Sequence, residues 1–326
     1  MSPPTSTRSS LAEALAGWPP PVLDPAGPFS EKITILAWAL FGIAVVTTLV
    51  VAISFWAAVW GPASVKRRFG GEKLIWAGGV AFPVVVLTGL LVWGLALTQD
   101  LSRKPTGDEL RIRVAGEMWW WRVSYLDANS REFAWDANEV HIPVGRPVIF
   151  EVTSNDVIHS FWIPRLAGKI DMIPGRVNTL RLTADRPGSY GGQCGEYCGG
   201  AHALMGFVAV AHPPAEFERV LAARAAPARP PASPVTLAGY QVFGASGCGA
   251  CHAVRGTPYN GLAGPDLTHV GARRSLGAGI LPNNQGTLGG WVSNVHDIKP
   301  GARMPPYQVL SGEELLSVSA YLDSLK

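Results

Sequence analysis

Residues 193–205 read QCGEYCGGAHALM, and this glycine-rich stretch contains four soft metal-binding side chains. Cys194 and Cys198 stand four positions apart, His202 follows Cys198 by four, and Met205 follows by three more. Thiolate, imidazole and thioether together are typical of copper electron-transfer sites. Because two thiolates can bridge two copper ions, the stretch predicts a dinuclear copper site in which each ion takes one histidine.

Such a site needs a second histidine and one further donor from outside these four side chains. His159, in NDVIHSFWIP, is the candidate histidine, because a neighbouring strand end can bring it close to the thiols. The backbone carbonyl of Glu196, between the two cysteines, is the candidate donor. A zinc ion bound by the same cysteines and histidines remains an alternative. The residues around the site supply no obvious general acid, general base or substrate pocket, which favours a one-electron relay over a catalyst.

The other two of the 4 cysteines form a second tight pair in the sequence GCGACHAV. Cys248, Cys251 and His252 make a C-x-x-C-H motif, which is typical of covalent haem attachment. Two thiols on one turn add to the two vinyl groups, and the adjacent histidine then faces the iron. A redox-active dithiol is the alternative. Since a histidine closely follows each cysteine pair, ligand roles are favoured over a disulfide framework.

A soft sixth ligand to the haem iron would give a high reduction potential. Met304, in PGARMPPY, is the only methionine after the haem motif, and its neighbouring prolines suit a rigid ligand loop. His269 and His296 are the rival ligands, and either would give a lower potential.

Two long apolar runs lie near the N-terminus. Residues 33–60 and 74–99 contain no charged side chain, and each run exceeds the ~20 residues needed to cross a bilayer. The loop between them is mostly basic, with Lys66, Arg67, Arg68 and Lys73 against Glu72. Positive loops stay on the cytoplasmic side, so both ends of the hairpin are expected to face outward. Residues 1–30 lack the apolar region of a cleavable signal peptide.

The rest of the chain predicts two further domains. Short strands separated by turn residues indicate an all-β sandwich or barrel, with strands expected at 110–116, 119–126, 139–145, 147–154, 159–164, 178–184 and 206–212. A short helix and a Pro/Ala linker follow, and a small helical domain ends in a helix whose capping box is Ser311 with Glu314. The expected boundaries are a tail at 1–30, a transmembrane hairpin at 31–100, a copper domain at 107–213, a helix and linker at 214–236, and a haem domain at 237–326.

Charge and composition exclude one class of partner. The formal net charge is +3 and charged residues make up 16% of the chain. Since no basic stretch carries interleaved aromatic residues, nucleic acid is not expected to bind.

The copper motif, together with DVIHSFWIP and KIDMIPGR, resembles cytochrome c oxidase subunit II over roughly residues 30–213. The resemblance implies a cupredoxin barrel with a dinuclear CuA centre. Its ligands would be His159, Cys194, Glu196 through its carbonyl, Cys198, His202 and Met205. It also implies that the Glu196 side chain reaches a magnesium ion at the boundary with subunit I.

An aromatic cluster, GEMWWWRV, matches another feature of that family. By this resemblance Trp119 is the port through which electrons reach the copper domain. Trp120 and Trp121 are expected instead to lie in the barrel core or to rest on the membrane surface. Glu72 does not stand cleanly at the position where many family members carry a proton-path glutamate, so we expect a solvated loop charge there.

The C-terminal domain resembles a class I cytochrome c, with GPDL near residue 265. Both resemblances together imply the electron-input subunit of a caa-type haem–copper oxidase in a bacterial inner membrane. Two helices would anchor it, with the N-terminus and the C-terminal domains on the periplasmic face. Electrons would pass from a donor cytochrome c through haem c and CuA to the haem of subunit I, where oxygen is reduced; subunit III is a further expected partner.

Three other functions remain open for such a chain. A nitric oxide reductase can also use a CuA-containing input subunit. A quinol-oxidase subunit II would keep the fold but bind no copper. A stand-alone copper-binding or copper-delivery protein would lack a large membrane partner.

Overall fold

The computed structural model describes residues 21–69, 71–101, 107 and 109–326. It forms two units, one of residues 31–104 and the other of residues 1–30 together with residues 105–326. Most of the predicted N-terminal tail, residues 1–20, lies outside the described residues.

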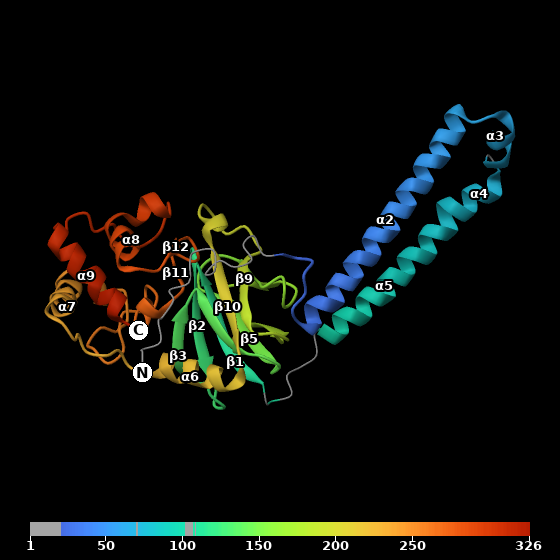
Figure 1. Ribbon diagram of the computed structural model, residues 1–326. Coiled ribbons are helices and arrows are strands. Elements are labelled where there is room, and N and C mark those ends of the chain that lie inside the picture. The colour runs from blue at the N-terminus through green and yellow to red at the C-terminus, as the bar shows by residue number, and fades with distance from the viewer. Residues whose placement is uncertain (1–20, 70, 102–106, 108) are drawn as a thin grey trace, which may run out of the picture. The chain divides into compact units, whose positions relative to one another are not determined.

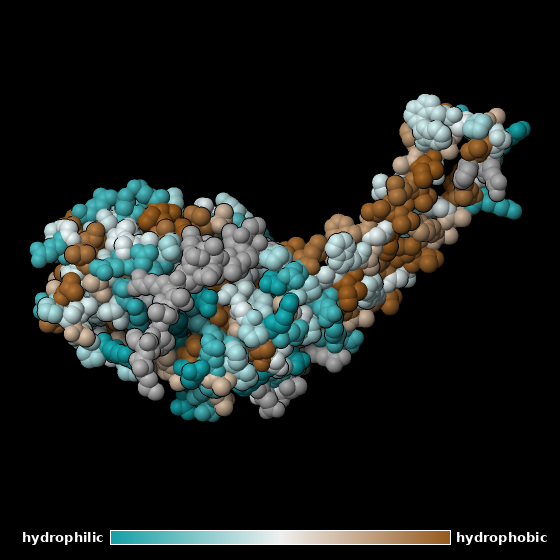
Figure 2. Space-filling model, in the orientation of Figure 1, coloured by the Kyte–Doolittle hydropathy of each residue, from teal (hydrophilic) through white to brown (hydrophobic). Residues whose placement is uncertain are grey.

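The first unit is a helical hairpin (Figure 1). Its helices are α2 (Pro28–Trp60), α3 (Ala63–Phe69), α4 (Glu72–Trp76), the π-helical segment η1 (Ala77–Ala81) and α5 (Phe82–Leu101). The stretch from Glu72 to Leu101 is continuously helical, and both it and α2 are long and apolar enough to cross a membrane. Figure 2 shows their hydrophobic side chains on the hairpin surface. The two expected apolar helices are therefore confirmed.

The second unit begins with a β domain of two five-stranded sheets. The first sheet has the order β3-β2-β1-β5-β8, and its strands are β1 (Leu110–Glu117), β2 (Trp120–Leu126), β3 (Glu132–Ala137), β5 (Val148–Ser154) and β8 (Asn178–Leu182). The second has the order β4-β10-β9-β6-β7, with β4 (Glu139–Pro143), β6 (His159–Trp162), β7 (Ile170–Met172), β9 (Gly188–Cys194) and β10 (Gly206–His212). Strand pairs β1–β5 and β4–β10 are parallel, and the other pairs are antiparallel.

Alternating side chains from both sheets fill one core. Trp121, Tyr125, Phe150 and Phe161 are fully buried there. Each of the seven expected strands is present, and β3, β7 and β9 are additional. This arrangement agrees with the predicted cupredoxin class.

Helix α6 (Pro214–Ala225) follows β10 and closes this core with Phe217 and Leu221. After an extended segment come the elements of the second predicted domain: α7 (Pro234–Ala245), η3 (Cys248–Ala250), η4 (Val270–Ala272), β11 (Ser275–Leu276), β12 (Leu281–Pro282), α8 (Gln285–Ile298) and α9 (Gly312–Ser324). Helices α7 and α9 cross closely at Gly239, where a Cβ atom would lie 2.0 Å from the Ser317 carbonyl oxygen. Glycine is therefore required at this crossing.

The predicted capping box at the start of α9 is present. The Glu314 amide donates to the Ser311 hydroxyl, and the Ser311 amide donates to the Glu314 carboxylate at 2.8 Å. These two bonds satisfy amides that a helix start would otherwise leave without partners. The local sequence therefore fixes where the last helix begins.

Candidate metal centres

Strand pairing brings the distant candidate ligands to one end of the β domain. His159 is the first residue of β6 and Cys194 the last of β9, and in this antiparallel pair Phe161 lies opposite Cys194. The motif then forms the loop between β9 and β10, which includes the short helix η2 (His202–Leu204). The Cys194 amide donates to the Met205 carbonyl at 3.1 Å, which closes the loop at its base.

Cys194 lies at the centre of the first group of donor atoms. Its Sγ atom is 3.8 Å from Cys198 Sγ, 3.8 Å from His159 Nδ1 and 3.1 Å from the Glu196 carbonyl oxygen. His159 is completely buried, and both cysteines are nearly so. The donor atoms of His159, Cys194 and Cys198 lie within 4.8 Å of one another.

Cys198 lies at the centre of the second group. Its Sγ atom is 3.5 Å from His202 Nδ1 and 3.7 Å from Met205 Sδ. Each sulfur therefore has its own histidine, and each has one weaker donor, a thioether or a backbone carbonyl. Soft sulfur donors with imidazoles suit copper, and two shared thiolates suit two ions. The residues present thus fit the dinuclear copper site that the sequence predicted.

The two thiols are electrostatically coupled. A hydrogen bond from Cys198 lowers the pKa of Cys194 to about 3, although burial opposes this, and the same contact raises the pKa of Cys198. The first proton therefore leaves easily and the second is retained. A cation must displace this second proton to bind both sulfurs as thiolates, so metal binding is coupled to proton release.

Asp156 was missed in the sequence reasoning, although it supports His159 directly. Its carboxylate lies 2.9 Å from His159 Nε2 and also accepts a bond from the Met118 amide at 2.7 Å. The contact leaves Nδ1 as the nitrogen available to a metal. Burial would lower the pKa of His159, but Cys194 and Asp156 outweigh it and raise the pKa. The D-x-x-H spacing in NDVIHSFWIP was the available signal.

The three consecutive tryptophans have different environments. The Trp119 indole is partly buried and donates to the Cys198 carbonyl oxygen at 2.9 Å. Trp121 is fully buried in the core, with its ring centroid 4.9 Å from that of Phe207. The Arg122 guanidinium covers the Trp120 ring at 4.7 Å. Of the three, Trp119 is the one whose hydrogen bond reaches the copper loop.

The C-x-x-C-H motif folds as a single tight turn. The His252 amide donates to the Cys248 carbonyl at 3.0 Å, and the short helix η3 covers the residues between. The His252 Nδ1 atom lies 2.8 Å from the Pro265 carbonyl oxygen, which leaves Nε2 for an iron. Burial lowers the pKa of His252, so the neutral, ligating form is favoured. The motif therefore fits covalent haem attachment.

A cavity of about 400 Å³ adjoins this turn. Cys248, Cys251, His252 and Met304 all line it. Among the described residues that line it, neither rival histidine occurs. His269 and His296 instead contact the carbonyl oxygens of Ala226 and Ala302, at 3.0 and 2.9 Å. The structure thus brings Met304 to the haem motif and leaves both rivals outside its cavity.

The fold and these two sites define a membrane-anchored protein with a copper-type β domain and a c-type haem domain. Family models agree: residues 127–212 match "Cytochrome C oxidase subunit II, periplasmic domain" and residues 237–326 match "Cytochrome c". Cytochrome c oxidase subunit 2 of Alkalihalophilus pseudofirmus is 35% identical over 315 residues, which covers 93% of this chain and 90% of the relative. The chain belongs to the cytochrome c oxidase subunit 2 family.

Two other proteins illustrate how far the similarity extends. Cytochrome c oxidase subunit 2 of Bacillus subtilis is 27% identical, over 93% of this chain and 91% of the relative. The crystal structure of the periplasmic domain of subunit II from Bradyrhizobium japonicum is 34% identical, covering 37% of this chain and 95% of that one, with a TM-score of 0.34.

Membership of this family confirms several predictions. The expected fold class and the expected enzyme class, a subunit of cytochrome c oxidase, are both confirmed. The two domains imply copper and haem as cofactors, and the family implies assembly with other oxidase subunits. The apolar hairpin and the periplasmic domain family fit a membrane anchor with a domain outside the cytoplasm.

Proposed function

We propose that this chain is the electron-input subunit of a caa-type terminal oxidase in a bacterial inner membrane. The observation that carries the proposal is the pairing of two thiols 3.8 Å apart, each beside its own histidine, with a C-x-x-C-H turn in the same chain. When bound, two coppers and one haem c each supply a one-electron relay. The electrons would come from a donor cytochrome c and leave toward the haem of subunit I, where O2 is reduced to water.

In this proposal the protein groups divide into ligands and connectors. His159, Cys194, Cys198, His202 and Met205, with the Glu196 carbonyl, hold the copper pair. Cys248 and Cys251 would attach the haem, and His252 and Met304 would bind its iron. Trp119 connects the two centres, because its indole is bonded to the backbone of a copper ligand and also lines the haem cavity.

Glu196 is proposed to serve a second site through its side chain. That carboxylate is 46% exposed and lies 4.0 Å from the Lys169 ammonium, so it is accessible to a partner. Magnesium prefers carboxylate oxygens and retains several waters. A magnesium ion shared with subunit I would therefore suit this position. Subunit III and the lipid bilayer are the remaining proposed partners.

The terminal acceptor belongs to the partner subunit, so a nitric oxide reductase is the competing assignment. The test is to purify the complex, reduce it through cytochrome c, and measure consumption of O2 and of nitric oxide. We expect oxygen consumption with negligible nitric oxide consumption. In stopped-flow measurements the haem should be reduced before the copper pair. Rapid nitric oxide consumption without oxygen consumption would contradict the oxidase assignment.

A further inference from the structure

Lys299 of the haem domain is buried against the copper domain. The residue follows α8 directly and is only 4% exposed. Its ammonium donates to the carbonyl oxygens of Trp119, Leu204 and Gly277 at 2.5, 2.8 and 2.9 Å. Trp119 and Leu204 belong to the copper domain, whereas Gly277 belongs to the haem domain. A lysine ammonium has three donors, and here every donor has a carbonyl acceptor.

Burying the charge on this lysine costs free energy unless its hydrogen bonds are made. Burial lowers the pKa of Lys299 to about 7, while the nearby Cys198 opposes that shift. Three accepting carbonyls favour the charged form. If the side chain were withdrawn, it would leave three inward-facing carbonyls without this donor. The contact is therefore specific to one docked arrangement of the two domains.

Two backbone contacts surround the lysine. Gly301 packs against the Trp119 indole so closely that a Cβ atom there would lie 3.0 Å from the ring. Gly301 also has a φ of +80°, a conformation that favours glycine. In addition, the Ala278 carbonyl accepts from the amide of Gly206, the residue directly after Met205, at 3.1 Å. The haem domain thus contacts both Trp119 and the end of the copper loop.

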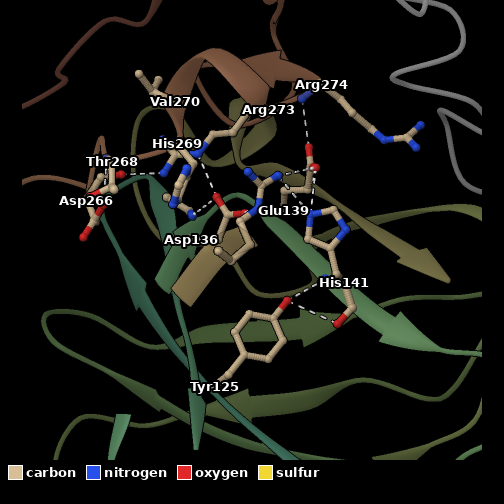
Figure 3. A network of polar contacts seen from close by, with 12 residues as sticks. Tyr125, Asp136, Glu139, His141, Asp266, Thr268, His269, Val270, Arg273 and Arg274 are labelled. Carbon is tan, nitrogen blue, oxygen red and sulfur yellow. Dashed lines mark hydrogen bonds and ion pairs between the residues drawn. The ribbon is translucent and has the colours of Figure 1, made fainter. Parts of the chain in front are cut away.

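A second set of polar contacts joins the two domains through Asp136 and Glu139 of the copper domain and Arg273 and Arg274 of the haem domain (Figure 3). Asp136 of β3 lies 2.8 Å from the Arg273 side chain of the haem domain and 2.9 Å from Arg224 of α6. The Glu139 carboxylate accepts from the Arg274 amide at 2.9 Å. All three side chains of the Asp136 ion pairs are at least nine-tenths buried. The two domains are therefore joined by buried ion pairs as well as by the Lys299 contact.

We propose that Lys299 is a positioning residue, which holds the haem domain in one orientation on the copper loop. This inference rests on the proposed function. It adds that the chain transfers electrons within a fixed unit, because the haem cavity, Trp119 and the copper loop keep one geometry. It also means that the chain's own haem domain covers Trp119. A soluble donor therefore delivers its electron to the haem and not to Trp119.

The test compares Lys299→Met with the wild type in the purified, fully loaded complex. Methionine has a similar length and fills the space without donors. The control is Lys326→Met, which removes the same charge from an exposed position in the same domain. Pulsed electron spin resonance on the oxidised complex measures the distance distribution between the haem and the copper pair, and flash reduction measures transfer between them.

We expect one narrow distance distribution in the wild type and in Lys326→Met. Lys299→Met should broaden it and slow haem-to-copper transfer, because all three contacts to carbonyl oxygens are lost. A narrow distribution with an unchanged rate, in a variant that retains copper and haem, would overturn the role of Lys299. If Lys299→Met loses a cofactor, Lys299→Gln replaces it in the test, because glutamine retains an amide donor. The same distance distribution and transfer rate are then measured. Absence of copper from the wild type would instead contradict the proposed function.

Discussion

The indole nitrogen of Trp119 donates a hydrogen bond to the carbonyl oxygen of Cys198 at 2.9 Å. One end of this side chain is therefore bonded to the backbone of a candidate copper ligand. The same residue lines the cavity beside the C-x-x-C-H turn. Trp119 is thus in contact with both proposed redox sites, which are otherwise built from separate domains.

Replacing Trp119 by phenylalanine should slow electron transfer while leaving both cofactors in place. Phenylalanine keeps an aromatic ring but loses the bond to Cys198. We expect haem-to-copper transfer to slow, because the hydrogen-bonded connection to the backbone of Cys198 is lost. Flash reduction of the purified complex measures this rate. Trp38→Phe, in the apolar helix α2, serves as the control. An unaffected rate in Trp119→Phe would exclude the indole from the connection.

The two cysteine pairs should respond independently to substitution. Cys198→Ser removes one of the two thiols proposed to hold the copper pair, so the mixed-valence copper signal should disappear while the haem remains reducible. Cys251→Ser is the reciprocal variant, and it should impair covalent haem attachment while leaving the copper signal intact. Electron spin resonance measures the copper signal in both variants, and haem staining of the denatured protein measures covalent haem attachment. A copper spectrum that survived in Cys198→Ser would show that the ligand assignment is wrong.

Met304→Ala should alter the haem but not the copper site. Loss of the thioether should remove the sulfur-to-iron charge-transfer band and lower the haem potential, because a soft axial ligand raises it. His269→Gln and His296→Gln are the matched controls, since both histidines contact backbone carbonyls and neither lines the cavity. Optical spectroscopy with a redox titration provides the measurement. If the band persisted in Met304→Ala and vanished in a histidine variant, the sixth ligand would be that histidine.

Asp136→Asn should separate the unfolding of the two domains. The substitution removes the carboxylate that pairs with the buried guanidinium group of Arg273, while Arg224 retains Glu139 at 3.5 Å, and breaking such a buried pair costs about 3 kcal/mol or more. Calorimetry of the complex should show a lower melting temperature for the haem domain. Glu132→Gln, at a partly exposed ion pair with Arg113, should change the stability by under ~1 kcal/mol. Equal effects of the two variants would argue against a structural role for the buried pair.

The folded state around Glu139 should become less stable in acid. Burial alone would raise the pKa of Glu139, but its bond with His141 and the charges of His141 and Arg224 lower it to about 2. A carboxyl group with a lowered pKa stabilises the folded state fully above its ordinary value of 4.5 and progressively less as the pH falls toward 2. The loss amounts to about 3 kcal/mol across that range. Urea unfolding at several pH values measures it, and Glu139→Gln should flatten the dependence. An equally steep dependence in that variant would assign the effect to other groups.

The sequence was most informative where chemistry depends on local spacing. The C-x-x-C-H turn, the copper loop and the Ser311–Glu314 capping box are local, so their residues predict their geometry directly. His159 was also predictable, because a histidine at a strand end is a familiar way to complete a site started elsewhere. Strand β9 was missed because GSYGGQC is rich in glycine, which weakens any strand signal.

The interface between the haem and copper domains could not be predicted from the sequence. Lys299 follows a helix in one domain, and nothing near it in the sequence indicates that its acceptors are Trp119 and Leu204. Asp136 likewise has no sequence feature that distinguishes it from an ordinary strand residue, and its two arginine partners are known only from the structure. Contacts between residues so distant in the chain depend on tertiary docking, which leaves no periodic signal.

Metal and haem content per chain, with an electron spin resonance spectrum of the oxidised complex, tests the dinuclear copper centre most directly. We predict two coppers and one covalent haem per chain, with one unpaired electron shared equally between the two copper nuclei. A single zinc ion, a single copper ion or no metal at the Cys194–Cys198 pair would contradict the proposed electron relay.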